Sequence, residues 1–269
     1  MDTNIITYGV NERTVCFSDL DKKVEEFNLR GFTFLDSGLD KIQCLGLKNK
    51  LISAYQKQVS EIGGEKVIES IGDKNIIRCP LASDNSFLDV ATNEALMSFV
   101  EAILGKNYIL LMQNGVFNEP SNDQYQMGWH RDLNYQHWVS SKPIALNAML
   151  CLDPFNEITG GTYLLPYSQH FPLFPSDDFV RSQQIVPDVA EGTFIVMNAM
   201  VFHRTGYNLS SSARFGLNHV IGLPFLAQQI DIPRYAPHLY SLEDSVRNQY
   251  LGYKWNPVES VELWRKRRC

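Results

Sequence analysis

The sequence predicts a mostly β protein with additional helices, an α+β fold in which two antiparallel sheets form a jelly roll. Before Gly105 apolar residues recur at helical spacing, and after it the pattern changes to short apolar or alternating runs. Clusters of Gly, Pro, Asn, Asp and Ser separate these runs, as expected for consecutive antiparallel strands. The candidate strands are YILLMQNGVFN, MGWHRD, IALNAMLCL, GTYLLPY, GTFIVMN, MVFHRTG and ARFGLNHVIG.

The N-terminal third is predicted to be helical, with one early strand. Ser18 precedes an acidic first turn and Gly31 ends the same segment, which indicates a short capped helix. The alternating segment GFTFLDSG predicts a strand, and residues 39–62 carry apolar side chains at helical spacing. A further amphipathic helix is expected over 88–103, with Gly105 as its stop. The apolar stripes of these helices are expected to pack on the outer face of one sheet.

No internal repeat, low-complexity stretch or linker interrupts the chain, so we predict one domain over residues 1–269. Within it we expect a helical part over about 1–105, a jelly-roll part over about 106–225 and a C-terminal extension over 226–269.

Composition limits the classes of partner and compartment. A net charge of −6 argues against a nucleic-acid-binding surface, and no segment is long and apolar enough to suggest a membrane span. The five cysteines are scattered without a CxxC pair, which favours free thiols in a reducing compartment. The N-terminus lacks the pattern of a signal peptide, so we expect a cytoplasmic protein. Monomer and oligomer both remain open.

The segment His130-Arg131-Asp132, followed by His203 and Arg214, is the strongest functional signal. Side chains alternate along a strand, so His130 and Asp132 are expected on one face. A distant histidine, His203, would complete a 2-His-1-carboxylate site of the kind that binds Fe(II) and leaves positions open. Eleven residues later, Arg214 offers a guanidinium fork that can bind a carboxylate. An iron site together with an anion anchor is typical of a 2-oxoglutarate-dependent oxygenase.

The chain resembles the phytanoyl-CoA dioxygenase family over about 190 residues, from GFTFLDSG to ARFGLNHVIG. The segments that carry the resemblance are WHRDLNY, NEITGGTYLLPYSQH and FHRTGYNLSSSARFGLNHVIG, although Tyr167 and Gln169 depart from the spacing of the family's PGSH stretch. The resemblance implies a cupin-like double-stranded β-helix. It also implies an enzyme that uses Fe(II), 2-oxoglutarate and O2 to hydroxylate a small-molecule substrate, releasing succinate and CO2.

Further residue roles follow from this resemblance. Gln113 and Asn118 precede the metal motif where family members place amides near 2-oxoglutarate, and Thr205 occupies the position of a hydroxyl that helps hold its far carboxylate. The lysine that many relatives carry in this region is absent here, which shifts the anchoring role to Arg214 and Thr205. Asn147 is a further candidate for the same pocket. An aspartate at position 132 leaves no iron position for a halide, so hydroxylation, desaturation or ring closure is favoured over halogenation.

Candidate substrate contacts lie in the segments around the motif: Arg78, Trp129, Tyr135, His137 and Trp138. Their mixed polar and aromatic character suggests a small, partly polar metabolite. Trp129 has core packing as its alternative role, and residues 171–181 suit either a lid or an ordinary surface loop.

Two readings outside oxygenase chemistry remain open. The same three ligands could hold zinc in a structural or hydrolytic site. Alternatively, the chain is a binding module that kept the fold without turnover. The zinc site does not account for Arg214 and Thr205, and an intact triad with its anchor argues against the binding module.

Overall fold

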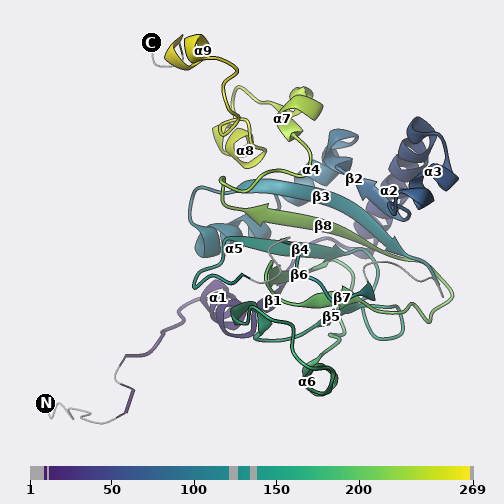
Figure 1. The fold of residues 1–269 in the computed structure, drawn as a ribbon, viewed down its shortest axis with the longest axis vertical. Coiled ribbons are helices and arrows are strands. Elements are labelled where there is room, and N and C mark those ends of the chain that lie inside the picture. Colours follow the sequence, from purple (N-terminus) through teal and green to yellow (C-terminus); the bar gives the residue numbers. More distant parts are fainter. Residues whose placement is uncertain (1–8, 11, 121–126, 134–137, 267–269) are drawn as a thin grey trace, which may run out of the picture.

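The computed structural model describes residues 9–10, 12–120, 127–133 and 138–266. Its centre is a six-stranded antiparallel sheet with the order β1-β6-β4-β8-β3-β2 (Figure 1). The strands are β1 (Phe32–Asp36), β6 (Thr193–Asn198), β4 (Ala145–Cys151), β8 (Arg214–Gly222), β3 (Ile109–Asn118) and β2 (Ile76–Arg78). A second, two-stranded sheet pairs β5 (Thr162–Leu164) with β7 (His203–Thr205). The two antiparallel sheets confirm the predicted jelly roll.

The N-terminal helices cover the outer face of the large sheet, as the sequence predicted. They are α1 (Asp19–Arg30), α2 (Lys41–Ile62), α4 (Asn85–Ala91) and α5 (Glu94–Leu104), together with the short α3 (Glu65–Ser70). Ser18 and Gly31 cap α1 at its two ends, since Ser18 accepts a hydrogen bond from the Asp21 amide and Gly31 is left-handed. One continuous core joins Phe27, Leu51 and Phe99 from the helices to alternate residues of β4, β6 and β8.

Alternation along the strands divides the large sheet into two faces with different roles. On β8, Leu217 and Ile221 enter the core beneath the helices, whereas Asn218 and Val220 line a cavity on the opposite, inner face. The register places Asn118 opposite Arg214, Asn114 opposite Asn218, and Asn147 opposite Val220. Polar side chains therefore recur on the inner face at alternate positions of the strands. The second sheet encloses this face.

The second sheet is extended by single bridges rather than by full strands. His130 pairs with His203 on one side of β7, and Leu164 pairs with Ile185 beyond β5. The expectation of a strand over MGWHRD is therefore wrong in extent: only His130 makes a ladder pair, and Asp132 already lies in a bend. In Figure 1 this sheet and α6 (Asp177–Gln183) lie at the end of the molecule opposite the C-terminal helices.

One other expectation is corrected, and the C-terminal extension is found to contain helices. The amphipathic segment 88–103 is interrupted, because α4 ends at Ala91 and Asn93 caps a new helix by accepting a hydrogen bond from the Leu96 amide. The C-terminal extension contains α7 (Ile232–Tyr235), α8 (Ser245–Tyr250) and α9 (Val261–Lys266). Of these, α7 and α8 add Ile232 and Tyr250 to the helix-side core, whereas α9 buries no residue.

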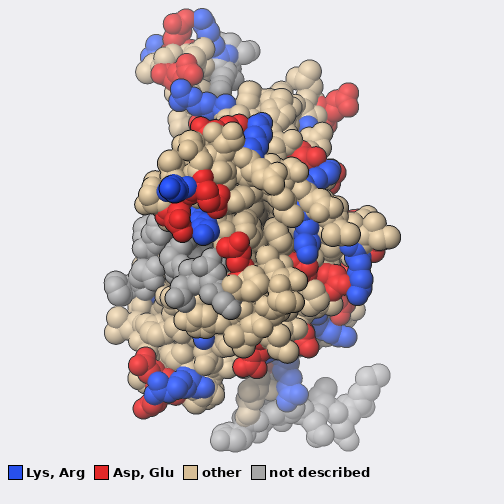
Figure 2. All heavy atoms as spheres, turned by 90° about the vertical axis from the view of Figure 1, so that its right-hand side faces the viewer, with Lys and Arg blue, Asp and Glu red and all other residues tan. Residues whose placement is uncertain are grey.

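On the face drawn in Figure 2, basic and acidic side chains of the described residues are interspersed. Within the described ranges, no helix is both long enough and apolar enough to cross a bilayer.

Candidate active site

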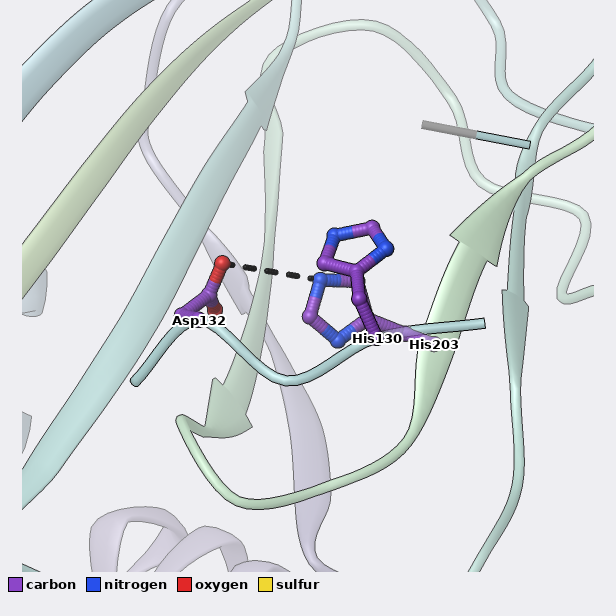
Figure 3. Close-up of side chains that lie close together, drawn as sticks. All are labelled: His130, Asp132 and His203. Atoms are coloured by element: carbon purple, nitrogen blue, oxygen red, sulfur yellow. Dashed lines mark ion pairs between the residues drawn. The ribbon is translucent and has the colours of Figure 1, made fainter. Parts of the chain in front are cut away.

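The three predicted metal ligands converge at the edge of the second sheet. The backbones of His130 and His203 exchange two hydrogen bonds of 3.0 Å each, and the Asp132 amide donates to the Ala199 carbonyl. These bonds bring together two segments that lie far apart in the sequence. The candidate ligand atoms of His130, Asp132 and His203 all lie within 4.8 Å of one another. Figure 3 shows the carboxylate and the two imidazoles pointing toward one another. The three residues are therefore placed so that they could hold one metal ion.

Each ligand is oriented by a second hydrogen bond. Nδ1 of His130 lies 2.9 Å from the Gly128 carbonyl, and Nδ1 of His203 lies 3.0 Å from the Val201 carbonyl. Because a carbonyl only accepts, Nδ1 carries the proton in both rings and Nε2 keeps its lone pair for a metal. Asn147 donates 2.8 Å to Asp132 Oδ2, while Oδ1 lies 3.6 Å from His203 Nε2. The donor set therefore suits a first-row divalent metal.

For His130 and Asp132, the electrostatics favour the protonation states that a metal requires. Burial, followed by the neighbouring His203, lowers the pKa of His130, so its imidazole is neutral near neutral pH. Burial opposes ionisation of Asp132, but the adjacent histidines and Asn147 outweigh it and lower the pKa of this carboxyl. Burial likewise disfavours the His203 imidazolium, yet Asp132 raises the pKa of His203 above its usual value. Without a metal, the Asp132 carboxylate therefore stabilises a positive charge on His203. A bound cation would balance the carboxylate charge instead, and His203 would then be neutral.

Arg214 is buried at the other end of the inner face, with no carboxylate partner among the described residues. Its side chain is 3 % exposed and lies 3.9 Å over the Phe155 ring. Nη2 donates to the Gly160 carbonyl at 2.9 Å and lies 3.4 Å from Thr205 Oγ1, and Nε lies 3.3 Å from the Thr159 carbonyl. Burial lowers the pKa of the guanidinium to about 10, which leaves it charged at neutral pH. A buried cation without a counter-ion is costly, so this position suits an anionic ligand.

A tight backbone turn shapes the wall beside Arg214. Gly160 has a φ of +70°, and a Cβ there would lie 2.5 Å from Asn118 Nδ2 and 2.6 Å from the Gly206 carbonyl. Asn118 bridges these two glycines by donating to both carbonyls, at 3.3 and 2.9 Å. Only glycine fits this geometry without strain. The turn is what allows the Gly160 carbonyl to approach the guanidinium.

A cavity of about 680 Å³ opens onto the metal ligands. His130 and Asp132 form part of its wall, and Asn114, Asn218 and Val220 contribute from the inner face of the large sheet. Its remaining lining combines apolar side chains, including Leu111 and Met112, with a few polar groups. A cavity of this size and character suits a small organic molecule beside the metal.

The family profile of phytanoyl-CoA dioxygenase (PhyH) matches residues 27–216, a range that contains both histidines, Asp132 and Arg214. The chain belongs to the phytanoyl-CoA dioxygenase family. It is therefore an oxygenase, in agreement with the resemblance found in the sequence.

Two curated relatives and several solved structures are similar to this family member. Uncharacterized proteins of Mycobacterium bovis and Mycobacterium tuberculosis are each 25% identical over 241 residues, covering 87% of this chain and 86% of the relative. The non-heme monooxygenase ThoJ in its apo form has a TM-score of 0.60 at 16% identity, with 79% and 80% of the two chains covered. Its nickel complex gives 0.57 at 17% identity over the same shares, and EvdMO1 gives 0.58 at 18% identity over 76% and 50%. These similarities support the fold.

The predicted cosubstrate residues fall into two groups. Thr205 and Asn118 lie with Arg214 around Gly160 and Gly206, and Asn147 lies with Asp132. Gln113 does not belong to either site, because its side chain faces the helices. It accepts from the Leu81 amide, donates to the Phe87 carbonyl and lies 2.9 Å from His219 Nε2. The expected contact of Gln113 with 2-oxoglutarate is therefore corrected to a role in joining helix and sheet.

The predicted substrate contacts are likewise divided by the structure. Arg78 and Trp129 line the cavity, whereas Trp138 is 45% exposed and is not part of its lining. Tyr135 and His137 lie outside the described residues. Residues 171–181 include the first part of α6 and the exposed Phe171 and Leu173, and Phe174 packs against Trp129 at a ring distance of 5.8 Å. Trp129 thus has both a cavity face and a packing contact.

Sequence reasoning missed Asn218, Gln229 and the role of Arg131. Asn218 shares the strand face of Arg214 four residues earlier, so a period-two count from Arg214 predicts its position. Gln229 belongs to the C-terminal extension, and no sequence pattern placed it at the cavity. Arg131, between two ligands, is 2% exposed and donates to the carbonyls of Met200, Ser168 and Phe171. It ties both ligand segments to the loop after β5.

Proposed function

We propose that this protein is an Fe(II)- and 2-oxoglutarate-dependent oxygenase that hydroxylates a small molecule. The observation that carries the proposal is the buried Arg214, which has no carboxylate partner in the described part of the chain and lies on the inner face that also leads to the triad. The cosubstrate has a carboxylate at each end, and one of them matches a guanidinium fork. Iron bound at His130, Asp132 and His203 would supply the chemistry that activates O2 beside the other end.

The residues of this chain would divide the work of the reaction. The two Nε2 atoms and Asp132 would hold the metal, while the Nδ1 bonds and Asn147 keep these groups aimed. Arg214 and Thr205 would fix the far carboxylate away from water. In the overall reaction one oxygen atom of O2 enters succinate, the other enters a substrate C–H bond, and CO2 leaves. The cavity beside His130 would hold that substrate.

An anaerobic titration tests the proposal. Fe(II) followed by 2-oxoglutarate should produce a visible charge-transfer band that requires both additions and saturates. Metal binding without this band would instead favour the zinc-site or binding-module alternatives.

The anchor can be tested separately with Arg214→Gln. We expect 2-oxoglutarate to bind this variant about a hundredfold more weakly, because a charge-assisted fork is lost while Fe(II) still binds. Arg181→Gln, which changes an exposed arginine, is the matched control and should match the wild type. Lost Fe(II) binding with unchanged cosubstrate affinity in Arg214→Gln would contradict the assignment.

A further inference from the structure

Two side-chain amides on the inner face of the large sheet carry acceptors without partners. Asn147 is 2% exposed, and its Oδ1 atom is buried without a hydrogen bond although its Nδ2 atom is bonded to Asp132. Oδ1 of Asn218 is also buried and unbonded. An unsatisfied buried acceptor costs free energy, so native proteins rarely keep one without a function.

These amides are close to each other and to the metal ligands. Asn147 pairs with Val220, and Asn218 pairs with the next inward-facing residue of β4, Met149, so the two asparagines are diagonal neighbours on one face. Asn218 lines the same cavity as His130 and Asp132. Within the described part of the chain, the Asn218 side chain makes no hydrogen bond. Asn218 therefore lines the cavity with an amide whose donor group and acceptor are both unbonded.

The ionic side chains around the cavity are already engaged. Arg78 forms an ion pair with Asp73, and its Nη1 lies 3.3 Å from Gln229 Oε1. Arg131 differs from Arg214 in that all three of its guanidinium nitrogens donate to backbone carbonyls, and Asp132 belongs to the candidate metal site. Among the described lining residues, no charged group is therefore left to neutralise an ionic group of a substrate at this wall. An uncharged group costs less to desolvate there than a carboxylate does.

We propose that Asn218, with Asn147 Oδ1 beside it, is a recognition subsite for an uncharged amide or hydroxyl group of the substrate. Such a group donates and accepts at once, as the Asn218 amide does, so it satisfies both asparagines next to the metal. This inference rests on the proposed oxygenase function and adds the substrate class: neutral, hydrogen-bonding molecules in place of carboxylates.

The test uses matched pairs of compounds on the wild-type protein loaded with Fe(II) and 2-oxoglutarate without O2. Hexanamide is compared with hexanoate, and N-acetyl-leucinamide with N-acetyl-leucine, by the perturbation that each causes in the charge-transfer band. We expect the amide of each pair to bind at least about tenfold more tightly than the acid. After addition of O2, we expect the amide to stimulate succinate release more than the acid does.

The Asn218→Leu and Asn218→Ser variants identify the residue responsible. Leucine should abolish the preference for amides, whereas serine should retain part of it because its hydroxyl still donates and accepts. Asn49→Leu, at an exposed position on α2, is the matched control and should keep the full preference. If Asn218→Leu does not fold, the subsite is still tested by the amide preference of the wild type and by its partial retention in Asn218→Ser.

The outcomes separate the two proposals. Absence of the charge-transfer band refutes the oxygenase function itself. A normal band with tighter binding of the acids, with no response to any compound, or with an amide preference unchanged in the Asn218 variants overturns only the recognition subsite.

Discussion

His219 should make the stability of this protein depend on pH in a defined window. The ring is fully buried on the helix-facing side of β8, 3.1 Å from the Ala148 carbonyl through Nδ1 and 2.9 Å from Gln113 Nε2 through Nε2. The neutral ring with its proton on Nδ1 satisfies both neighbours, since Gln113 then donates to Nε2. Burial lowers the pKa of His219 to about 4.

The size of the effect follows from that value. An unperturbed histidine has a pKa of about 6.5, and each unit of difference corresponds to about 1.4 kcal/mol. Because the folded pKa is the lower one, the unfolded chain binds more protons between about pH 4 and pH 6.5. The stabilisation that the neutral His219 ring contributes is therefore intact above about pH 6.5. It is lost as the pH falls, and the loss reaches about 3 kcal/mol near pH 4. At about pH 5 the loss is about 2 kcal/mol.

Urea denaturation of the metal-free protein between about pH 7 and pH 5 measures this loss. We expect the wild type to lose about 2 kcal/mol more than His219→Gln over that range, because the metal ligands titrate equally in both proteins. His238→Gln, at an exposed histidine, should behave as the wild type. Equal pH dependence in the wild type and His219→Gln would refute the assignment of a buried neutral ring.

Three further substitutions probe the frame of the site. Arg131→Met should lower the free energy of unfolding by about 3 kcal/mol, because it leaves the carbonyls of Met200, Ser168 and Phe171 without these donors; urea denaturation that shows under about 1 kcal/mol would contradict this. Asp132→Asn should weaken Fe(II) binding by at least about a hundredfold while the circular dichroism spectrum is kept, and wild-type affinity in a direct anaerobic titration would remove Asp132 from the ligand set. Gly160→Ala should destabilise the protein by about 1–3 kcal/mol because of its positive φ and the close Asn118 amide, and an unchanged melting temperature would show that the turn relaxes freely.

Much of the fold was predictable because its signals are local. The cap at Ser18, the glycine at Gly31 and the change from helical to strand spacing near Gly105 each act within a few residues. The split between α4 and α5 was missed because the apolar stripe continues across Thr92 and Asn93, while the Asn93 side chain replaces the helical bonding.

The triad and Arg214 were predicted from residue type and spacing, and Thr205 was predicted from the family resemblance. The structure brings the ligand atoms of His130, Asp132 and His203 within 4.8 Å of one another and places Thr205 Oγ1 3.4 Å from Arg214 Nη2. The face of Gln113 follows from alternation, because β3 stays in register from Met112 to Asn118 and residues 113 and 118 are an odd number apart. The resemblance to the family assigned both amides to the cosubstrate, although one strand cannot direct both to the same face. Gln229 and the partners of Arg131 depend on chain crossings that only the tertiary structure shows.

The reciprocal backbone bonds between His130 and His203 have a consequence for how the protein tolerates change. The two ligands occupy one rung of a ladder, so assembling the metal centre and pairing these two segments are a single event in folding. A slip of one residue would turn one imidazole to the opposite face and destroy the centre even if every hydrogen bond of the sheet were replaced. Insertions in the long connection between the two histidines are compatible with the centre wherever they leave this rung in register. The same pair of hydrogen bonds thus fixes where the two imidazoles meet and leaves the length of the connection between them free to differ.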